Sequence, residues 1–259
     1  MSAIFFDLEG TLLDKKHRLP PSAVEAVNRL RKEGHLVFVN TGFGRAEIRP
    51  EILDIGIDGI IAANGTSVHV GEKRILEETI PQSVLEEILP RFEERKIDLW
   101  LSGPEYVYVA DLQAEGFMAE VIAYLNMGRD IVRSWHDSQP VANQATYHCS
   151  EEGQIEPLLP LLNKHFVVVP HRLAVGELAL QGFNKGTGME LILKHLNREE
   201  EETYAFGDSL NDLSMFERAT HGIAMEGGAP ALLKKAEYIT ASPEEDGIER
   251  ALRHYNLLS

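Results

Sequence analysis

The stretch I-F-F-D-L-E-G-T-L-L, residues 4–13, sets the pattern that the rest of the chain repeats. It begins as an apolar run that is too short to span a membrane, and two carboxylates one residue apart, Asp7 and Glu9, interrupt it before a Gly-Thr pair that ends a strand. The pattern predicts a buried strand that ends in acidic side chains. In an open parallel α/β sheet, ligands bind at the carboxyl ends of the strands, so we expect these carboxylates to point into a site. Taken alone, such a pair more simply caps a turn.

The composition describes a globular protein with an acidic surface. The chain has 259 residues, 44% of them hydrophobic, which suits one large or two modest domains. A formal net charge of -16 argues against a nucleic-acid partner, and an anionic substrate would need local positive charge. The single cysteine, Cys149, excludes an intrachain disulfide and is expected to be a packing residue. We see no signal peptide before Asp7, so we expect a cytoplasmic location and no membrane partner.

Buried strands and helices alternate through the first and last parts of the chain. Such alternation predicts a doubly wound parallel sheet with right-handed crossovers and helices on both faces. A turn at Asn64-Gly65 is expected to start a hairpin into residues 66–70, and Pro50 is expected at a helix break or in a first helical turn. The strands are expected at 4–6, 36–39, 59–63, 203–206, 222–225 and 238–240, and the helices at 22–32 with Ser22 as N-cap, from Arg45, at 187–196, around Met215 and Phe216, and at 247–254.

From about residue 81 the pattern changes to an α+β module with antiparallel pairing. Two extended stretches, 98–101 and 106–109, read as a hairpin between helices at 83–95 and 114–125. An irregular segment through Pro140 follows, and then further extended stretches at 145–149, 166–169 and 173–180 around a helix at 155–162. We therefore predict a core domain formed by residues 1–80 and 183–259, with an α+β domain inserted at 81–182.

Polar side chains at several strand ends suggest a magnesium site. Asp7 and Asp208, with a backbone carbonyl nearby, supply the hard oxygen ligands that Mg²⁺ prefers. A carboxylate nucleophile approaches a dianionic phosphate only when cations screen both, and Mg²⁺ together with Lys185 would provide that screening.

Other groups at these strand ends suit the phosphate itself. The hydroxyl of Thr41, backbone N–H groups such as that of Gly42, and the amide of Asn211 are expected to hold the equatorial oxygens of a phosphoryl group. The arrangement predicts a site for a phosphate monoester.

Four segments resemble the four motifs of the haloacid dehalogenase (HAD) superfamily of phosphatases: F-D-L-E-G-T-L-L-D, N-T-G, N-K-G and G-D-S-L-N-D-L-S-M. The tail G-I-A-M-E-G-G-A-P-A-L-L-K-K-A-E-Y-I-T, followed by E-D-G-I, is similar to the Cof-type subgroup. In that subgroup, also named class IIB, a large α+β cap (a C2 cap) lies between the second and third motifs. The resemblance covers about residues 1–80 and 183–259 by motif, and the inserted part by position, size and element order.

The resemblance implies a covalent mechanism. Asp7 would attack phosphorus to form an aspartyl-phosphate that water then hydrolyses, and Thr41 and Lys185 would bind the phosphoryl group. Asn64 and Gly65 would lie where the family lines its cleft.

The resemblance also implies how the ion is held. Asp208 would bind Mg²⁺ together with Asp7 and the backbone carbonyl of Glu9, and Asp212 would support the metal ligands or Lys185.

Two positions depart from the family pattern. Where the phosphatases usually carry Asp as general acid and base, this chain has Glu9, whose additional methylene shifts the carboxylate, and geometric errors near 1 Å cost about 100-fold in rate. The usual arginine after Thr-Gly is replaced by Phe43, and Arg45 either substitutes for it or caps its helix.

These features favour a Mg²⁺-dependent phosphohydrolase that acts on a small phosphorylated metabolite, such as a sugar phosphate or a cofactor-like phosphomonoester, as a monomer or homodimer. A phosphomutase of the same superfamily would need the same aspartyl-phosphate and a cap that protects it from water. A catalytically weakened ligand-binding or regulatory protein is suggested only by Glu9, and the retention of Asp7, Lys185, Asp208 and Asp212 counts against it.

Overall fold

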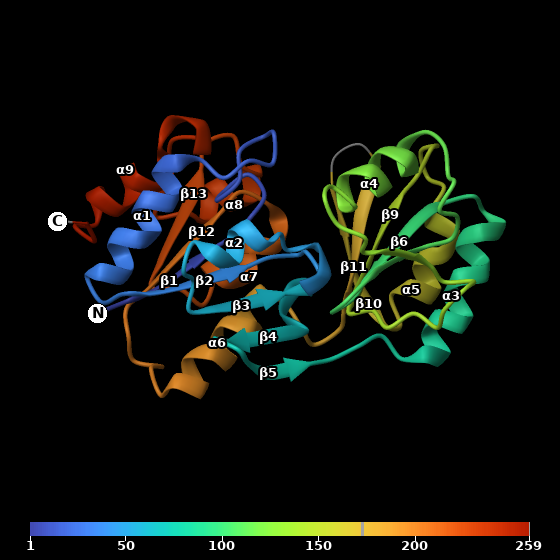
Figure 1. Ribbon diagram of the computed structural model, residues 1–259, viewed down its shortest axis with the longest axis horizontal. Coiled ribbons are helices and arrows are strands. Elements are labelled where there is room, and N and C mark those ends of the chain that lie inside the picture. The colour runs from blue at the N-terminus through green and yellow to red at the C-terminus, as the bar shows by residue number, and fades with distance from the viewer. Residues whose placement is uncertain (172–173, 259) are drawn as a thin grey trace. The chain divides into compact units, whose positions relative to one another are not determined.

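The computed structural model describes residues 1–171 and 174–258, which fold into two compact units (Figure 1). The first, here called the core unit, contains Met1–Gly42, Arg49–Leu76 and Asn184–Ser259. The second, here called the inserted unit, contains Phe43–Ile48 and Glu77–Phe183. The inserted unit thus begins at Glu77 rather than at residue 81, and it also includes a short segment from the first part of the chain.

The core unit is built on one sheet with β1 near its centre. In spatial order its strands are β14 (Tyr238–Thr240), β13 (His221–Met225), β12 (Thr203–Gly207), β1 (Ala3–Phe6), β2 (Leu36–Asn40), β3 (Gly59–Ala62), β4 (Ser67–Val70) and β5 (Lys73–Glu77). The pairs from β14 to β3 are parallel, as expected from the alternating pattern. The predicted hairpin is also confirmed, because β3 and β4 pair antiparallel across Asn64-Gly65.

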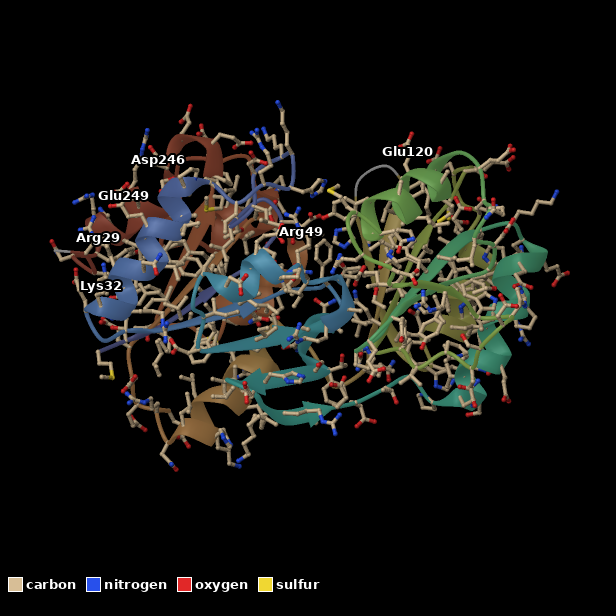
Figure 2. The ribbon with its side chains drawn as sticks, in the orientation of Figure 1. Arg29, Lys32, Arg49, Glu120, Asp246 and Glu249 are labelled. Atoms are coloured by element: carbon tan, nitrogen blue, oxygen red, sulfur yellow. The ribbon has the colours of Figure 1, made fainter. Side chains whose placement is uncertain are left out.

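Helices cover both faces of this sheet, which confirms the doubly wound α/β fold class. On one face, α6 (Lys185–Leu196), α7 (Leu213–Phe216) and α8 (Pro230–Lys235) bury apolar side chains against Phe5 and Phe38, whose rings stack at 4.9 Å. On the other, α1 (Pro21–Lys32) packs against α9 (Gly247–His254), where Arg29 and Glu249 lie side by side (Figure 2). In the described part of the chain, no helix combines the length and apolar character that crossing a membrane requires.

Some expected helix starts were wrong by one or two residues. The first helix begins at Pro21, with Pro20 and not Ser22 at the N-cap, because the fixed φ of proline suits the first helical turn and its missing N–H has no partner there in any case. The helix expected from residue 187 begins at Lys185, since Asn184 caps it by accepting from the backbone N–H of Thr187. Helix α8 was not expected.

The inserted unit contains a second, mainly antiparallel sheet, and it agrees with the expected α+β character. In spatial order its strands are β10 (Phe166–Pro170), β11 (Val175–Leu180), β9 (Gln144–His148), β6 (Asp98–Ser102), β7 (Val107–Val109) and β8 (Val132–Ser134). The hairpin between β6 and β7 is confirmed. The segment expected to be irregular contains β8, which pairs parallel with β7, and that expectation was wrong because three residues are too few to show a period. Leu173, expected at the start of β11, lies outside the described residues.

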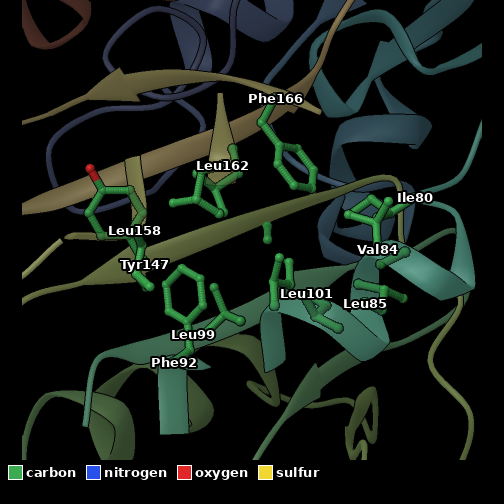
Figure 3. Packing of buried hydrophobic residues seen from close by; sticks show 14 of the residues in the cluster. Ile80, Val84, Leu85, Phe92, Leu99, Leu101, Tyr147, Leu158, Leu162 and Phe166 are labelled. Carbon is green, nitrogen blue, oxygen red and sulfur yellow. The ribbon is translucent and has the colours of Figure 1, made fainter. Parts of the chain in front are cut away.

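The two faces of this sheet are covered by different helices. Helices α3 (Gln82–Glu94) and α5 (Leu159–Leu162) enclose a cluster that includes Phe92, Leu101 and Phe166 (Figure 3). Helix α4 (Phe117–Leu125) covers the opposite face beside β7 and β8. Cys149 is buried in the first cluster, where burial raises the pKa of its thiol, in agreement with a packing role.

The segment 43–48 is held by the inserted unit through backbone contacts. The N–H of Ala46 donates to the carbonyl of Gly103 at 3.2 Å, and Nη1 of Arg129 donates to the carbonyl of Ala46 at 2.8 Å. Its helical turn is the 3-10 turn Arg45–Glu47, so Arg45 does begin a helical stretch. Helix α2 (Pro50–Asp54) then starts with Pro50 in its first turn, one of the two positions expected for that proline.

Candidate active site

The strand order brings three of the predicted polar segments to one edge of the core sheet. Strand β1 lies between β12 and β2, with Phe6 opposite Phe206 on one side and opposite Val39 on the other. All three strands are parallel and neighbours in the sheet (Figure 1). Asp7, Thr41 and Asp208 therefore follow their carboxyl ends at the same edge. This edge is where ligands bind in open α/β sheets.

The loop after β1 is tightly coiled around Asp7. The N–H of Asp7 donates to the carbonyl of Phe206 at 2.9 Å, and the N–H of Leu12 donates back to the carbonyl of Asp7 at 3.2 Å. Gly10 has a φ of 72°, and a Cβ atom there would lie 2.5 Å from Oδ2 of Asp208. Only glycine therefore allows this loop to pass so close to Asp208 at the end of β12.

Lys185 carries the ammonium group at the centre of the site. Its side chain is fully buried, and Nζ donates to Oδ1 of Asp7 and to Oδ1 of Asp212, both at 2.6 Å. Burial acts to lower the pKa of Lys185, but the carboxylates of Asp212 and Asp7 outweigh it and the pKa is raised. Lys185 is therefore charged across the physiological range.

The backbone of Lys185 is fixed by two neighbouring segments. Its carbonyl accepts from Nδ2 of the buried Asn40 at 3.0 Å, which ties the start of α6 to the end of β2. On the other side, a Cβ atom on Gly65 would lie 2.3 Å from the carbonyl oxygen of Asn184, at a φ of 95°. The turn at residues 63–65 thus packs directly on the start of α6. Together with the Asn40 hydrogen bond, this packing fixes the position of Lys185 without a bound ligand.

Asp212 organises the segment that follows β12. Its Oδ2 accepts from the backbone N–H of Asp208 at 2.9 Å and of Ser209 at 2.8 Å, while its Oδ1 faces Lys185. Asn211 lies beside it and donates from Nδ2 to Oδ1 of Asn64 at 3.2 Å. The amide predicted to bind phosphate is therefore on the same edge as the turn that follows β3.

The carboxylates form a group that could hold a cation. Among the described residues, Asp7, Asp208 and Asp212 each offer one oxygen, and these oxygens lie within 4.8 Å of one another. Burial raises the pKa of Asp7, Lys185 opposes that rise, and the charges of Asp212 and Asp208 add to it. One ammonium group faces three carboxylates, so a hard divalent cation with oxygen ligands, such as Mg²⁺, suits the donor set and the charge.

Thr41 and Gly42 lie at the same edge and are buried. The N–H of Thr41 donates to the carbonyl of Ile61 at 2.8 Å, and its carbonyl accepts from the N–H of Asn64 at 3.1 Å. Glu9 differs from the other predicted groups, because its carboxylate pairs with Nδ1 of His17. The hydrogen bond with Glu9 raises the pKa of His17.

Two residues of this site were not predicted as such. Asn40 stands directly before Thr41 in the N-T-G motif, so its place at a strand end was visible, but its contact with Lys185 spans distant parts of the chain. His17 lies eight positions after Glu9 in a polar loop, where no periodic pattern points to a partner. Arg45 belongs to the inserted unit, and its burial lowers its pKa.

The chain is similar to known proteins in both sequence and structure. The model of the haloacid dehalogenase-like hydrolase family matches residues 4–252. The putative phosphatase YkrA of Bacillus subtilis is 27% identical, covering 98% of each chain. The 5-amino-6-(5-phospho-D-ribitylamino)uracil phosphatase YitU of the same organism is 26% identical over 97% of this chain and 96% of its own. Among solved structures, the subclass IIB sugar phosphatase BT4131 is 29% identical over all of both chains, with a TM-score of 0.85. The chain therefore belongs to the haloacid dehalogenase-like hydrolases, within the Cof-type phosphatases of that family.

Proposed function

We propose that this chain is a Mg²⁺-dependent phosphohydrolase that removes phosphate from a small phosphorylated metabolite through an aspartyl-phosphate on Asp7. The observation that carries the proposal is the buried Lys185, whose ammonium group is shared by Asp7 and Asp212 beside Asp208. A fixed cation beside a carboxylate nucleophile is what attack on a phosphate dianion requires. We include sugar phosphates and cofactor-like phosphomonoesters in the substrate class, since a sugar phosphatase is among the similar structures.

Asp7 and Asp208 would ligate Mg²⁺ together with the backbone carbonyl of Glu9. Both carboxylate oxygens of Asp212 are already engaged, one by Lys185 and the other by two backbone N–H groups. We therefore propose that Asp212 orients the groups around the ion. When bound, the ion supplies positive charge that neutralises the carboxylates and the phosphoryl oxygens.

The chain's own groups account for the two half-reactions. An oxygen of Asp7 attacks phosphorus, the bond to the leaving oxygen breaks, and Glu9 gives that oxygen its proton. Water then attacks the aspartyl-phosphate, Glu9 takes a proton from it, and phosphate leaves as the carboxylate of Asp7 is restored. Lys185 balances charge in both steps, while Thr41 and the other phosphate-binding groups, Gly42 and Asn211, hold the equatorial oxygens.

A screen of phosphomonoesters with Mg²⁺ tests this function. We expect the wild type to release inorganic phosphate, Asp7→Asn to be inactive, and Glu9→Asp to keep or raise turnover, because aspartate is the residue this family usually has there. Asp54→Asn, which makes the same exchange on the exposed surface of α2, serves as control. Retained activity in Asp7→Asn would refute the assignment of Asp7 as the nucleophile. Isomer formation without phosphate release would point to a phosphomutase, and tight binding without turnover to a regulatory protein.

The state of the protein in the cell stays a prediction. From the sequence alone, we expect a cytoplasmic enzyme that works as a monomer or homodimer.

A further inference from the structure

The loop after the first motif places a histidine against the side chain of Glu9. Nδ1 of His17 and Oε1 of Glu9 form a hydrogen bond, and a carboxylate can only accept, so Nδ1 carries the proton in this contact. Both side chains are partly exposed, with 44% and 39% of their surface accessible for His17 and Glu9. The contact therefore lies at an accessible edge of the core unit, where a leaving group could reach the same carboxylate.

The loop is built to present this histidine. The carboxylate of Asp14 accepts from the backbone N–H groups of Lys16 at 2.8 Å and Arg18 at 2.9 Å, and from the Arg18 guanidinium at 2.7 Å. The N–H of Asp14 donates back to the carbonyl of Arg18 at 2.9 Å. The hydrogen bonds with Arg18 lower the pKa of Asp14 to about 2, which favours the carboxylate that accepts them. At its apex His17 has a φ of 55°, a left-handed conformation that most residues avoid.

Glu9 needs such a partner more than aspartate would. The backbone of its loop is fixed by hydrogen bonds, including that from the N–H of Leu13 to the carbonyl of Leu8 at 2.8 Å. The glutamate side chain adds one rotatable bond to the two of aspartate, so a fixed backbone leaves its carboxylate less well placed. Proton transfer requires the carboxylate to lie within hydrogen-bond distance of the leaving oxygen, so a carboxylate that is not held in one position transfers the proton poorly.

We propose that His17 is a positioning residue that holds one oxygen of Glu9 and thereby directs the other toward the leaving group. The proposal rests on the proposed function, because it assumes that Glu9 exchanges the proton. His17 itself gives no proton to the substrate: Glu9 protonates the leaving oxygen as the P–O bond breaks, and recovers a proton from the attacking water.

Substitution of His17 by asparagine or aspartate isolates the hydrogen bond. Both replacements tolerate the left-handed conformation, and both put a polar atom where Nδ1 lies. Asparagine can donate an N–H to Glu9, whereas aspartate sets a carboxylate against it. His17→Asn should therefore rescue what His17→Asp loses.

The readout is kcat/KM on two substrates. One is the alcohol phosphomonoester that the wild type hydrolyses best, whose basic leaving group needs a proton. The other is p-nitrophenyl phosphate, whose leaving group needs almost none. Because kcat/KM reports phosphoryl transfer to Asp7 and not the later hydrolysis, only the first ester should depend on Glu9 at this stage. The ratio of the two values is also independent of how much of a variant is folded.

We expect His17→Asp to lower kcat/KM by about 100-fold on the alcohol ester and by less than about threefold on p-nitrophenyl phosphate. His17→Asn should stay within about threefold of the wild type on both, as should Lys16→Ala, a control in the same loop with an exposed side chain. Equal losses on both esters, or equal losses in the Asp and Asn variants, would overturn the positioning role.

The last test places His17→Asp in a Glu9→Asp background. The carboxylate introduced there is too short to reach His17, so in that background His17→Asp should leave the ratio of the two kcat/KM values unchanged. A ratio that shifts as much as in the wild-type background would show that His17 acts by another route and would refute the proposal. A wild type that releases phosphate from no phosphomonoester of the screen would refute the proposed function itself, and the role of His17 with it.

Discussion

Replacing Lys185 by methionine tests whether the ammonium group holds the site together. Methionine keeps the length and apolar stem of the side chain but leaves Asp7 and Asp212 buried without their shared cation. Removing one partner of a buried ion pair costs about 3–5 kcal/mol, because the remaining charge is uncompensated. With about 2–4 °C per kcal/mol for a domain of this size, Tm should fall by about 6–20 °C.

The same variant should show a dependence on pH with a defined sign. Without the ammonium group the pKa of Asp7, already raised by burial, rises further, so its ionisation in the folded state becomes more costly. The deficit in the free energy of unfolding should therefore be larger at pH 8 than at pH 5, where protonation of the carboxylate relieves it.

The assays are urea denaturation, for the free energy of unfolding, and thermal unfolding, for Tm. Both compare wild type and variant in the presence of a chelator, so that no divalent cation substitutes for the lysine. Lys194→Met is the matched control, because it makes the same exchange at an exposed position of the same helix. A free energy of unfolding for Lys185→Met within about 1 kcal/mol of that for Lys194→Met would contradict the buried ion pair, since such a pair left without one partner costs several times that amount.

Three further outcomes follow from particular contacts. Gly10→Ala should lower kcat/KM by about 100-fold or more, because its Cβ would lie 2.5 Å from Oδ2 of Asp208 and displace that carboxylate, whereas an unchanged value would show that the loop adapts. At a hundredfold excess over its Kd, Mg²⁺ should stabilise the wild type by about 2.7 kcal/mol in thermal unfolding, and Asp208→Asn should abolish this gain if the assigned ligand is correct. Burial acts to lower the pKa of His221, but its hydrogen bonds with Glu202 and Glu237 raise it, so its stabilising effect is complete below the ordinary value of 6.5 and is lost as pH rises through the raised pKa. His221→Gln should therefore lower Tm by about 1–3 °C at pH 6 and by less at pH 9, and an equal loss at both would exclude an ionic origin.

The layout of the core could be predicted because its signals are local. Apolar runs such as residues 4–6 and 36–39 end at polar clusters, and the parallel topology then brings those ends to one edge. The union of Asp7, Asp208 and Lys185 follows from this rule together with the family motifs. The distances between these three side chains could not be predicted. They depend on close packing around Gly10 and Gly65, which the lengths and hydrophobic patterns of the strands and helices do not encode.

The features that could not be predicted either depend on contacts between distant parts of the chain or are too short to show a sequence pattern. Strand β8 has three residues, and its register is set by β7 rather than by its own sequence. The partnership of Glu9 with His17 depends on a left-handed backbone conformation in a polar loop. The membership of residues 43–48 in the inserted unit depends on Arg129, more than eighty positions away, which no local signal identifies.

That last feature governs how chimeras of this enzyme should be cut. An exchange of residues 77–183 alone, the obvious graft at the two chain crossings, would leave the Ala46 carbonyl facing a foreign module without the Arg129 guanidinium that binds it at 2.8 Å. A donor sequence would need to bring its own version of the six residues after Gly42, so that a recombinant has three crossover sites in the first half of the chain and one in the second. The two stretches would therefore have to be inherited together.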